Sequence, residues 1–149
     1  MRKFIAKNKK ARFDYEILDT LIAGISLFGH EVKSIRAGKI SLNESFAKII
    51  SGELWLVGAH INQYKQNTNK LYDPTRSRKL LVKRKEIDFL LGKTKEKGLT
   101  IIPLAVFLQD NKLVKIELGV GRGKKLHDKR ETIKRREQDR DIKRKYGRI

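Results

Sequence analysis

Cysteine is absent from this chain of 149 residues, which has only two prolines and one tryptophan. Without cysteine the chain can form no disulfide bond and offers no thiolate to a metal, a usage that fits the reducing cytoplasm. No run approaches the roughly 20 apolar residues of a membrane-spanning helix. The basic start lacks the apolar segment and cleavage site of a secretory signal. We therefore expect a cytoplasmic protein with no membrane partner.

Acidic residues are also scarce, with 17 Asp and Glu against 36 Lys and Arg, for a net charge of +19. Residues 1–121 carry +11 and residues 122–149 carry +8. Such a balance favours a polyanionic partner, because each cation that contacts a phosphate releases a condensed counterion. General solubility and an anionic membrane surface are the alternatives, but a membrane binder needs an amphipathic helix with a continuous apolar face, and we find none. The charge predicts binding to nucleic acid.

Catalytic patterns are missing as well. The three histidines, His30, His60 and His127, lack the spacing of a helical zinc pair. The glycines at 119–123 superficially resemble a phosphate-binding loop, but Lys124 is followed by Lys125 where that loop needs Ser or Thr. We expect no catalytic site, no metal and no cofactor.

Apolar periodicity predicts a mainly β protein. Strands are expected at 14–27, 45–50, 53–61, 78–82, 99–109 and 112–120, and short helices at 30–38 and 85–97. Turns are expected at 51–52 and 110–111. A twisted antiparallel sheet of this size avoids exposed edges by closing on itself. We predict a six-stranded antiparallel barrel of the oligonucleotide-binding type, with short flanking helices.

Four irregular features are expected in this body. Gly24 marks a bulge or a corner in a long bent strand, and Pro103, which cannot donate a ladder hydrogen bond, marks an edge, a bulge or a break. The polar stretch 62–77 is a long loop, which is usually functional or mobile. Residues 1–12 form a basic arm that either grips a partner or frays.

The chain divides at its glycine-rich junction. We expect one domain at 1–121, which can bury a core, and a basic tail at 122–149. In the tail, Leu126 and Ile133 share a helical face while Ile142 and Tyr146 lie near the opposite one, so no apolar stripe persists. We predict that the free tail is disordered and becomes helical on a polyanionic partner.

Glu31 stands out because it lies on the predicted helix at 30–38 beside Lys33 and Arg36. A salt bridge to one of these cations is one interpretation. The other is a hydrogen bond to a base edge, since a carboxylate accepts from the amino groups of guanine or cytosine.

Several motifs resemble the SmpB family, the SsrA-binding proteins of bacterial trans-translation. They run in order along nearly the whole chain: Asn8-Lys9-Lys10-Ala11-Arg12, Asp14-Tyr15-Glu16-Ile17-Leu18, Gly29-x-Glu31-Val32-Lys33-Ser34-Ile35-Arg36-Ala37-Gly38-Lys39, Asp73-Pro74-x-Arg76-x-Arg78-Lys79-Leu80-Leu81 and Gly123-Lys124-Lys125-x-His127-Asp128-Lys129-Arg130. Ile22 departs from the family pattern, which usually has an acid before Ala-Gly.

The resemblance implies an adaptor that binds the tRNA-like domain of tmRNA (SsrA RNA). With elongation factor Tu, it would deliver that RNA to ribosomes stalled on messages without a stop codon. Its implied RNA-binding residues are Asn8, Lys9, Lys10, Arg12, Glu31, Lys33, Arg36, Arg122, Lys124 and Lys125. His127, Asp128, Lys129 and Arg130 match the segment that meets the ribosomal decoding site, and the remaining tail would lie in the empty mRNA channel.

Two other functions stay open from the sequence. A basic structural ribosomal protein would share the fold and the charge, and it would have a stoichiometric place in vacant ribosomes. An RNA-processing enzyme would cleave RNA as the pure protein with added metal. We expect the adaptor to be a monomer.

Overall fold

Nine strands and three helices make up the described part of the computed structural model, which covers residues 1–64, 71–96 and 98–124. The strands are β1 (Arg2–Lys7), β2 (Tyr15–Ile25), β3 (Ile40–Ser41), β4 (Phe46–Ile50), β5 (Glu53–Val57), β6 (His60–Ile61), β7 (Arg78–Leu81), β8 (Leu99–Gln109) and β9 (Leu113–Gly123). The helices are α1 (Lys9–Asp14), α2 (Gly29–Arg36) and α3 (Arg84–Thr94). The prediction of a mainly β protein with short helices is confirmed.

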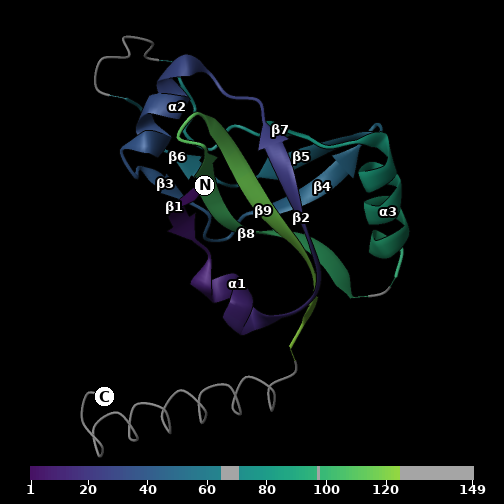
Figure 1. Ribbon diagram of the computed structural model, residues 1–149. Coiled ribbons are helices and arrows are strands. Elements are labelled where there is room, and N and C mark those ends of the chain that lie inside the picture. The colour runs from purple at the N-terminus through teal and green to yellow at the C-terminus, as the bar shows by residue number, and fades with distance from the viewer. Residues whose placement is uncertain (65–70, 97, 125–149) are drawn as a thin grey trace, which may run out of the picture.

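Six of the strands close into an antiparallel ring in the order β8-β4-β5-β7-β2-β9, with β9 pairing back onto β8 (Figure 1). β1 adds to β8, and β3 pairs with β6 in a separate two-stranded sheet. Closure gives each of the six strands two neighbours. The expected closure of six strands is therefore confirmed.

Both predicted hairpin turns are present, and their backbone angles explain them. Ser51 and Gly52 have φ of 51° and 77°, and Asp110 and Asn111 have φ of 52° and 58°. Two consecutive positive φ angles give the turn whose twist matches the flanking strands. The strand expected at 53–61 ends early, at Val57, because φ is 85° at Gly58.

One of the two predicted strand irregularities is found. The β8–β9 register shifts between Pro103 and Ala105, so the proline lies at a bulge. Gly24 is not at a bulge: it pairs in regular register with Lys115 of β9 on one side and with Leu81 of β7 on the other. The bulge in β2 lies elsewhere, between Ile17 and Asp19.

The first fourteen residues are more structured than expected. The predicted basic arm forms β1, which pairs along β8, and then α1. Asn8 joins them: its backbone N–H donates to the oxygen of Leu104 at 2.8 Å, and its side chain caps α1 by accepting from the N–H of Ala11 at 3.1 Å. A frayed terminus is therefore ruled out for this segment.

Apolar side chains from every strand of the ring fill its interior. The main cluster is Ala23, Ile35, Leu42, Ala47, Leu54, Leu56, Ala59, Ile61, Leu80, Leu90, Leu99, Ile101, Val106, Ile116, Leu118 and Val120. A second cluster, Ala11, Ile102 and Leu104, holds α1 against β8. Ile35 and Leu90 are the fully buried anchors of α2 and α3, so each helix is fixed to the ring by one apolar side.

The strand β9 continues past the expected domain boundary at 121, with Gly123 still paired to Tyr15 of β2. The backbone N–H of Lys124 then donates to the oxygen of Asp14 at 2.8 Å. Residues 125–149 lie outside the described residues, and so does the expected disorder of the tail. None of the three helices in the described residues has the length and the apolar composition of a membrane span.

Candidate nucleic-acid interface

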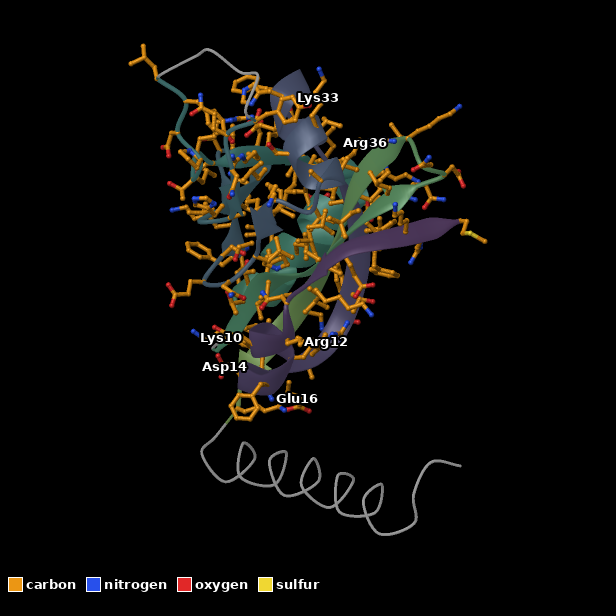
Figure 2. The ribbon with its side chains drawn as sticks, turned by 90° about the vertical axis from the view of Figure 1, so that its left-hand side faces the viewer. Lys10, Arg12, Asp14, Glu16, Lys33 and Arg36 are labelled. Carbon is orange, nitrogen blue, oxygen red and sulfur yellow. The ribbon has the colours of Figure 1, made fainter. Side chains whose placement is uncertain are left out.

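The structure divides the predicted RNA-binding cations between two ends of the ring (Figures 1 and 2). Lys9, Lys10 and Arg12 lie on α1, and the register of β2 and β9 brings Arg122 beside Glu16 at the same end. We call the end of the ring that carries Lys9, Lys10, Arg12, Arg122 and Lys124 the α1 end. Lys33 and Arg36 lie on α2 at the other end, the α2 end.

The α1 end carries mixed charge. Lys10 pairs with Glu44 at 3.6 Å, and Arg12 with Glu117 of β9 at 3.1 Å. Both cationic side chains are more than half exposed, at 57% and 54%. An ion pair exposed on both sides, such as Lys10–Glu44, contributes only about 0–1 kcal/mol. Lys10 can therefore exchange its carboxylate for a phosphate at little cost, whereas Arg12 is paired with a carboxylate that is only 19% exposed.

Asn8 is buried beneath this end instead of facing solvent. Only 3% of the residue is exposed. Its amide nitrogen donates to the oxygens of Pro103 at 2.9 Å and Leu42 at 3.3 Å. The direct RNA contact expected of Asn8 is not available in this conformation. The residue instead positions α1, which carries the exposed lysines.

The two cations of the α2 end, Lys33 and Arg36, are exposed, and neither forms an ion pair among the described residues. The Lys33 ammonium lies 5.6 Å from the centre of the Tyr64 ring. Arg36 donates to the backbone oxygen of Asn111, in the turn between β8 and β9, at 3.1 Å. Figure 2 shows both side chains extending outward from α2, where a phosphate can reach them.

Glu31, which precedes both cations on α2, is fully buried. Its Oε2 accepts from Arg78 Nη2 at 2.7 Å and Nε at 3.0 Å, and its Oε1 accepts from Arg76 Nη2. The Tyr72 hydroxyl lies 3.0 Å from Oε2, and the Phe28 backbone N–H donates to Oε1 at 2.9 Å. We call Glu31, Tyr72, Arg76 and Arg78 the buried ionic network.

The buried ionic network favours a charged carboxylate despite its burial. Burial by itself raises the pKa of Glu31, but the hydrogen bonds from Arg76, the Phe28 backbone and Arg78 outweigh it and lower that pKa to about 2. Burial, together with the hydrogen bond and the negative charge of Glu31, raises the pKa of Tyr72 to about 12. The network therefore holds one carboxylate, two guanidinium groups and a neutral phenol near neutral pH.

Two expectations for Glu31 change on this geometry. The salt bridge is present, but its partners are Arg76 and Arg78, which lie 45 and 47 residues away, and not Lys33 or Arg36. Direct contact with a base edge is not available to a side chain with no exposed surface and both oxygens occupied. The network instead attaches α2 to the segment before β7.

No role was predicted from the sequence for Arg76, Arg78 or Tyr72. Arg78 is fully buried and also donates to the oxygens of Ala59 at 2.7 Å and Pro74 at 2.9 Å. The motif around Asp73-Pro74 was visible, but an arginine beside a turn is normally exposed. Burial of its guanidinium depends on a carboxylate that only the folded chain brings near.

The described residues contain no group of three or more His, Asp or Glu side chains that could hold a metal ion. His30 lies on α2 and His60 on β6, while His127 falls outside the described residues together with Lys125, Asp128, Lys129 and Arg130.

Comparison with known proteins places the chain in a family. The sequence model of the family described as SmpB protein matches residues 5–148. The chain belongs to the SmpB protein family. An SsrA-binding protein of Gloeothece citriformis is 52% identical over 143 residues, which cover 95% of this chain and 92% of that protein. An SsrA-binding protein of Salinispora tropica is 52% identical over 147 residues, covering 99% and 92%.

A solved structure agrees with the SmpB assignment. It is described as "tmRNA-SmpB: a journey to the center of the bacterial ribosome". The matching chain is 46% identical, with a TM-score of 0.68 over 81% of this chain and 85% of that one. The two chains therefore share a fold over most of their lengths.

Proposed function

We propose that this chain is an RNA-binding adaptor that binds the tRNA-like domain of tmRNA and is required for its delivery to stalled ribosomes in trans-translation. The observation that carries the proposal is the SmpB match over residues 5–148, with SsrA-binding relatives at 52% identity. The cationic ends supply the chemistry, because exposed lysines and arginines bind RNA phosphates. The six-stranded ring is a barrel of the oligonucleotide-binding type.

The RNA-binding residues fall into two classes in this proposal. The exposed cations contact RNA directly: Lys9, Lys10, Arg12, Lys33, Arg36 and Arg122. In this proposal Lys124, which is partly buried, and Lys125, which lies outside the described residues, also contact RNA. Asn8 and Glu31 act through the elements they fix, since both side chains are buried and hydrogen-bonded. Asn8 holds α1 in place, and Glu31 holds α2.

The basic tail supplies the second half of the adaptor function. His127, Asp128, Lys129 and Arg130 meet the ribosomal decoding site, where a histidine ring stacks on an exposed base and cations follow rRNA phosphates. The following residues occupy the empty mRNA channel as a helix. A channel still filled by message excludes them sterically, so the tail reports that the channel is vacant.

The other partners follow from this role. Elongation factor Tu is reached by way of the tmRNA complex, and the adaptor acts as a cytoplasmic monomer. It supplies binding and no chemistry of its own, so it needs no metal or cofactor.

Gel-shift titration with the tRNA-like domain of tmRNA tests the binding step. We expect tight binding that weakens with salt, and we expect the double change Lys9→Ala and Lys10→Ala to weaken it further. Lys85→Ala on α3 is the matched control, an exposed lysine on another helix, and should leave affinity unchanged. Equal affinity for unrelated RNAs, with a stoichiometric place in vacant ribosomes, would instead support a structural ribosomal protein.

Truncation after Lys125 tests the tail. The shortened chain should still bind the tRNA-like domain but should no longer support peptide tagging on stalled ribosomes. Normal tagging by the truncated chain would refute the role of the tail and leave the RNA-binding proposal standing.

A further inference from the structure

An aromatic ring is exposed at the start of α2. Phe28 precedes the helix, and 52% of it is accessible to solvent. The guanidinium carbon of Arg76 lies 3.9 Å from the centre of its ring, the distance of direct stacking. Such a contact shields part of the ring and leaves the rest available.

The guanidinium of Arg76 is held in place by hydrogen bonds. Its Nε and Nη2 donate to the two oxygens of Glu31, and its Nη1 donates to the oxygen of Ser77 at 3.4 Å. Glu31 is in turn fixed by Arg78. Because each nitrogen of Arg76 has an acceptor and its charge is matched by a carboxylate, Arg76 suits a stacking surface better than a phosphate ligand.

A second ring lies beside Phe28, and an exposed cation lies on the helix that Phe28 precedes. The His30 ring centre lies 5.7 Å from that of Phe28, with the two planes tilted by 34°. Lys33 is exposed on the same helix, with its ammonium beside the Tyr64 ring. Aromatic rings interleaved with free cations characterise proteins that bind unpaired RNA, in which rings stack on bases and cations contact the phosphates between them.

We propose that Phe28, backed by Arg76, is a stacking platform for one unpaired base of RNA, with Lys33 contacting a neighbouring phosphate. The proposal deepens the proposed function and rests on it, because it assigns a base-stacking subsite to the α2 end. It also gives the buried ionic network a role: the network pre-organises Arg76, so that this side chain need not be ordered when the base arrives.

The chain contains a matched control on α3. Phe89 is 42% exposed, and the Lys93 ammonium lies 5.8 Å from its ring centre. Here the cation is a flexible lysine whose nearest acid is Glu96 at 4.0 Å. Phe89 therefore shares exposure and a cation with Phe28 but lacks the fixed guanidinium.

Binding of a single-stranded hexaribonucleotide containing 2-aminopurine to the full chain tests the platform. Stacking quenches the fluorescence of this base, so one titration reports both affinity and stacking. We expect Phe28→Ala to weaken binding about 5- to 150-fold and to abolish the quenching. Phe28→Trp should retain both, and Phe89→Ala should match the wild type. If Phe28→Trp retains binding and quenching, the losses in Phe28→Ala come from removal of the aromatic ring and not from unfolding.

Salt dependence distinguishes the ring from the cation. Phe28→Ala should leave the slope of log K against log salt unchanged, whereas Lys33→Ala should reduce its magnitude by about 0.7, the value for one phosphate on a single strand. Equal effects of Phe28→Ala and Phe89→Ala, unchanged binding by Phe28→Ala, or no binding of the hexanucleotide by the wild type would overturn the platform. Failure to bind the tRNA-like domain as well would overturn the proposed function itself.

Discussion

At the scale of single residues, Glu31 makes the most consequential contacts in the described chain. It sits in the first turn of α2 and joins that helix to Arg76 and Arg78, which precede and begin β7. Removing one partner from a buried ion pair leaves the other charge without compensation. The side chain therefore matters more for stability than any exposed acid.

Glu31→Gln is expected to lower the free energy of unfolding by about 3–5 kcal/mol, because it leaves Arg78 charged, buried and without a carboxylate. Urea denaturation measures the change. Glu53→Gln is the matched control, because Glu53 pairs with Lys79 at 3.4 Å but both side chains are nearly half exposed, and it should cost about 0–1 kcal/mol. Similar losses in the two variants would contradict the importance of the buried ionic network.

The pH dependence of stability provides a second residue-scale prediction. The pKa of Glu31 is lowered from 4.5 to about 2 by folding, so between these values the unfolded chain binds more protons. The stability that Glu31 contributes is thus complete above about pH 4.5 and is lost as the pH falls through about 2. The difference in unfolding free energy between wild type and Glu31→Gln should shrink across this range. If this difference stays constant down to pH 2, the proposal that Glu31 is ionised in the folded chain is refuted.

At the scale of elements, β9 is central because it pairs with both β2 and β8. Glycines on β9, which have no side chain, permit its close packing between these two strands. A Cβ at Gly119 would lie 2.8 Å from Leu104 Cδ1 and 3.2 Å from Ile17 Cγ2. Leu104 is fully buried, so its side chain has little room to move aside.

Gly119→Ala should therefore destabilise the chain by about 1–3 kcal/mol through overpacking. Gly123→Ala lies four residues further along the same strand, where an added Cβ meets nothing within 4 Å. That variant should stay within about 1 kcal/mol of the wild type. Thermal unfolding of the two variants decides the point, and equal melting temperatures would show that Leu104 yields easily.

Sequence-based prediction succeeded for elements with local signals. The hairpin turns, the bulge at Pro103 and the left-handed Gly38 just after α2, where φ is 77°, all follow from the preferences of the residues that form them. Prediction missed β1 and α1. Their local pattern is polar, and they form because Asn8 and the backbone of β8, about 95 residues away, supply their hydrogen bonds.

At the scale of the whole molecule, both apolar clusters lie between Ala11 and Val120 in the described residues. The strand pairing, however, continues to Gly123 and the last described hydrogen bond to Lys124. We infer that the folding unit ends near Lys124 and not at residue 121.

Truncation after Lys124 should therefore leave the unfolding free energy within about 0.5 kcal/mol of the full chain, since it removes no described contact. Truncation after Gly121 should cost more, because it removes the pairing of Arg122 and Gly123 with β2 and the hydrogen bond to Asp14. Urea denaturation of the three chains tests this. A large loss on the first truncation would show that the tail contributes to the core.

The sequence by itself determined the charge, the mainly β class and the SmpB resemblance, because each depends on composition or on motifs within short stretches. It also predicted that six strands close, but which strands pair, such as β2 with β9, depends on residues far apart in the chain. Only the tertiary structure decided that the cations fall at two ends and that Asn8 and Glu31 face inward. It also decided that Arg76 is stacked on Phe28 and held by Glu31. The physical reason is that burial and ion pairing depend on residues distant in the chain, and no local pattern carries that information.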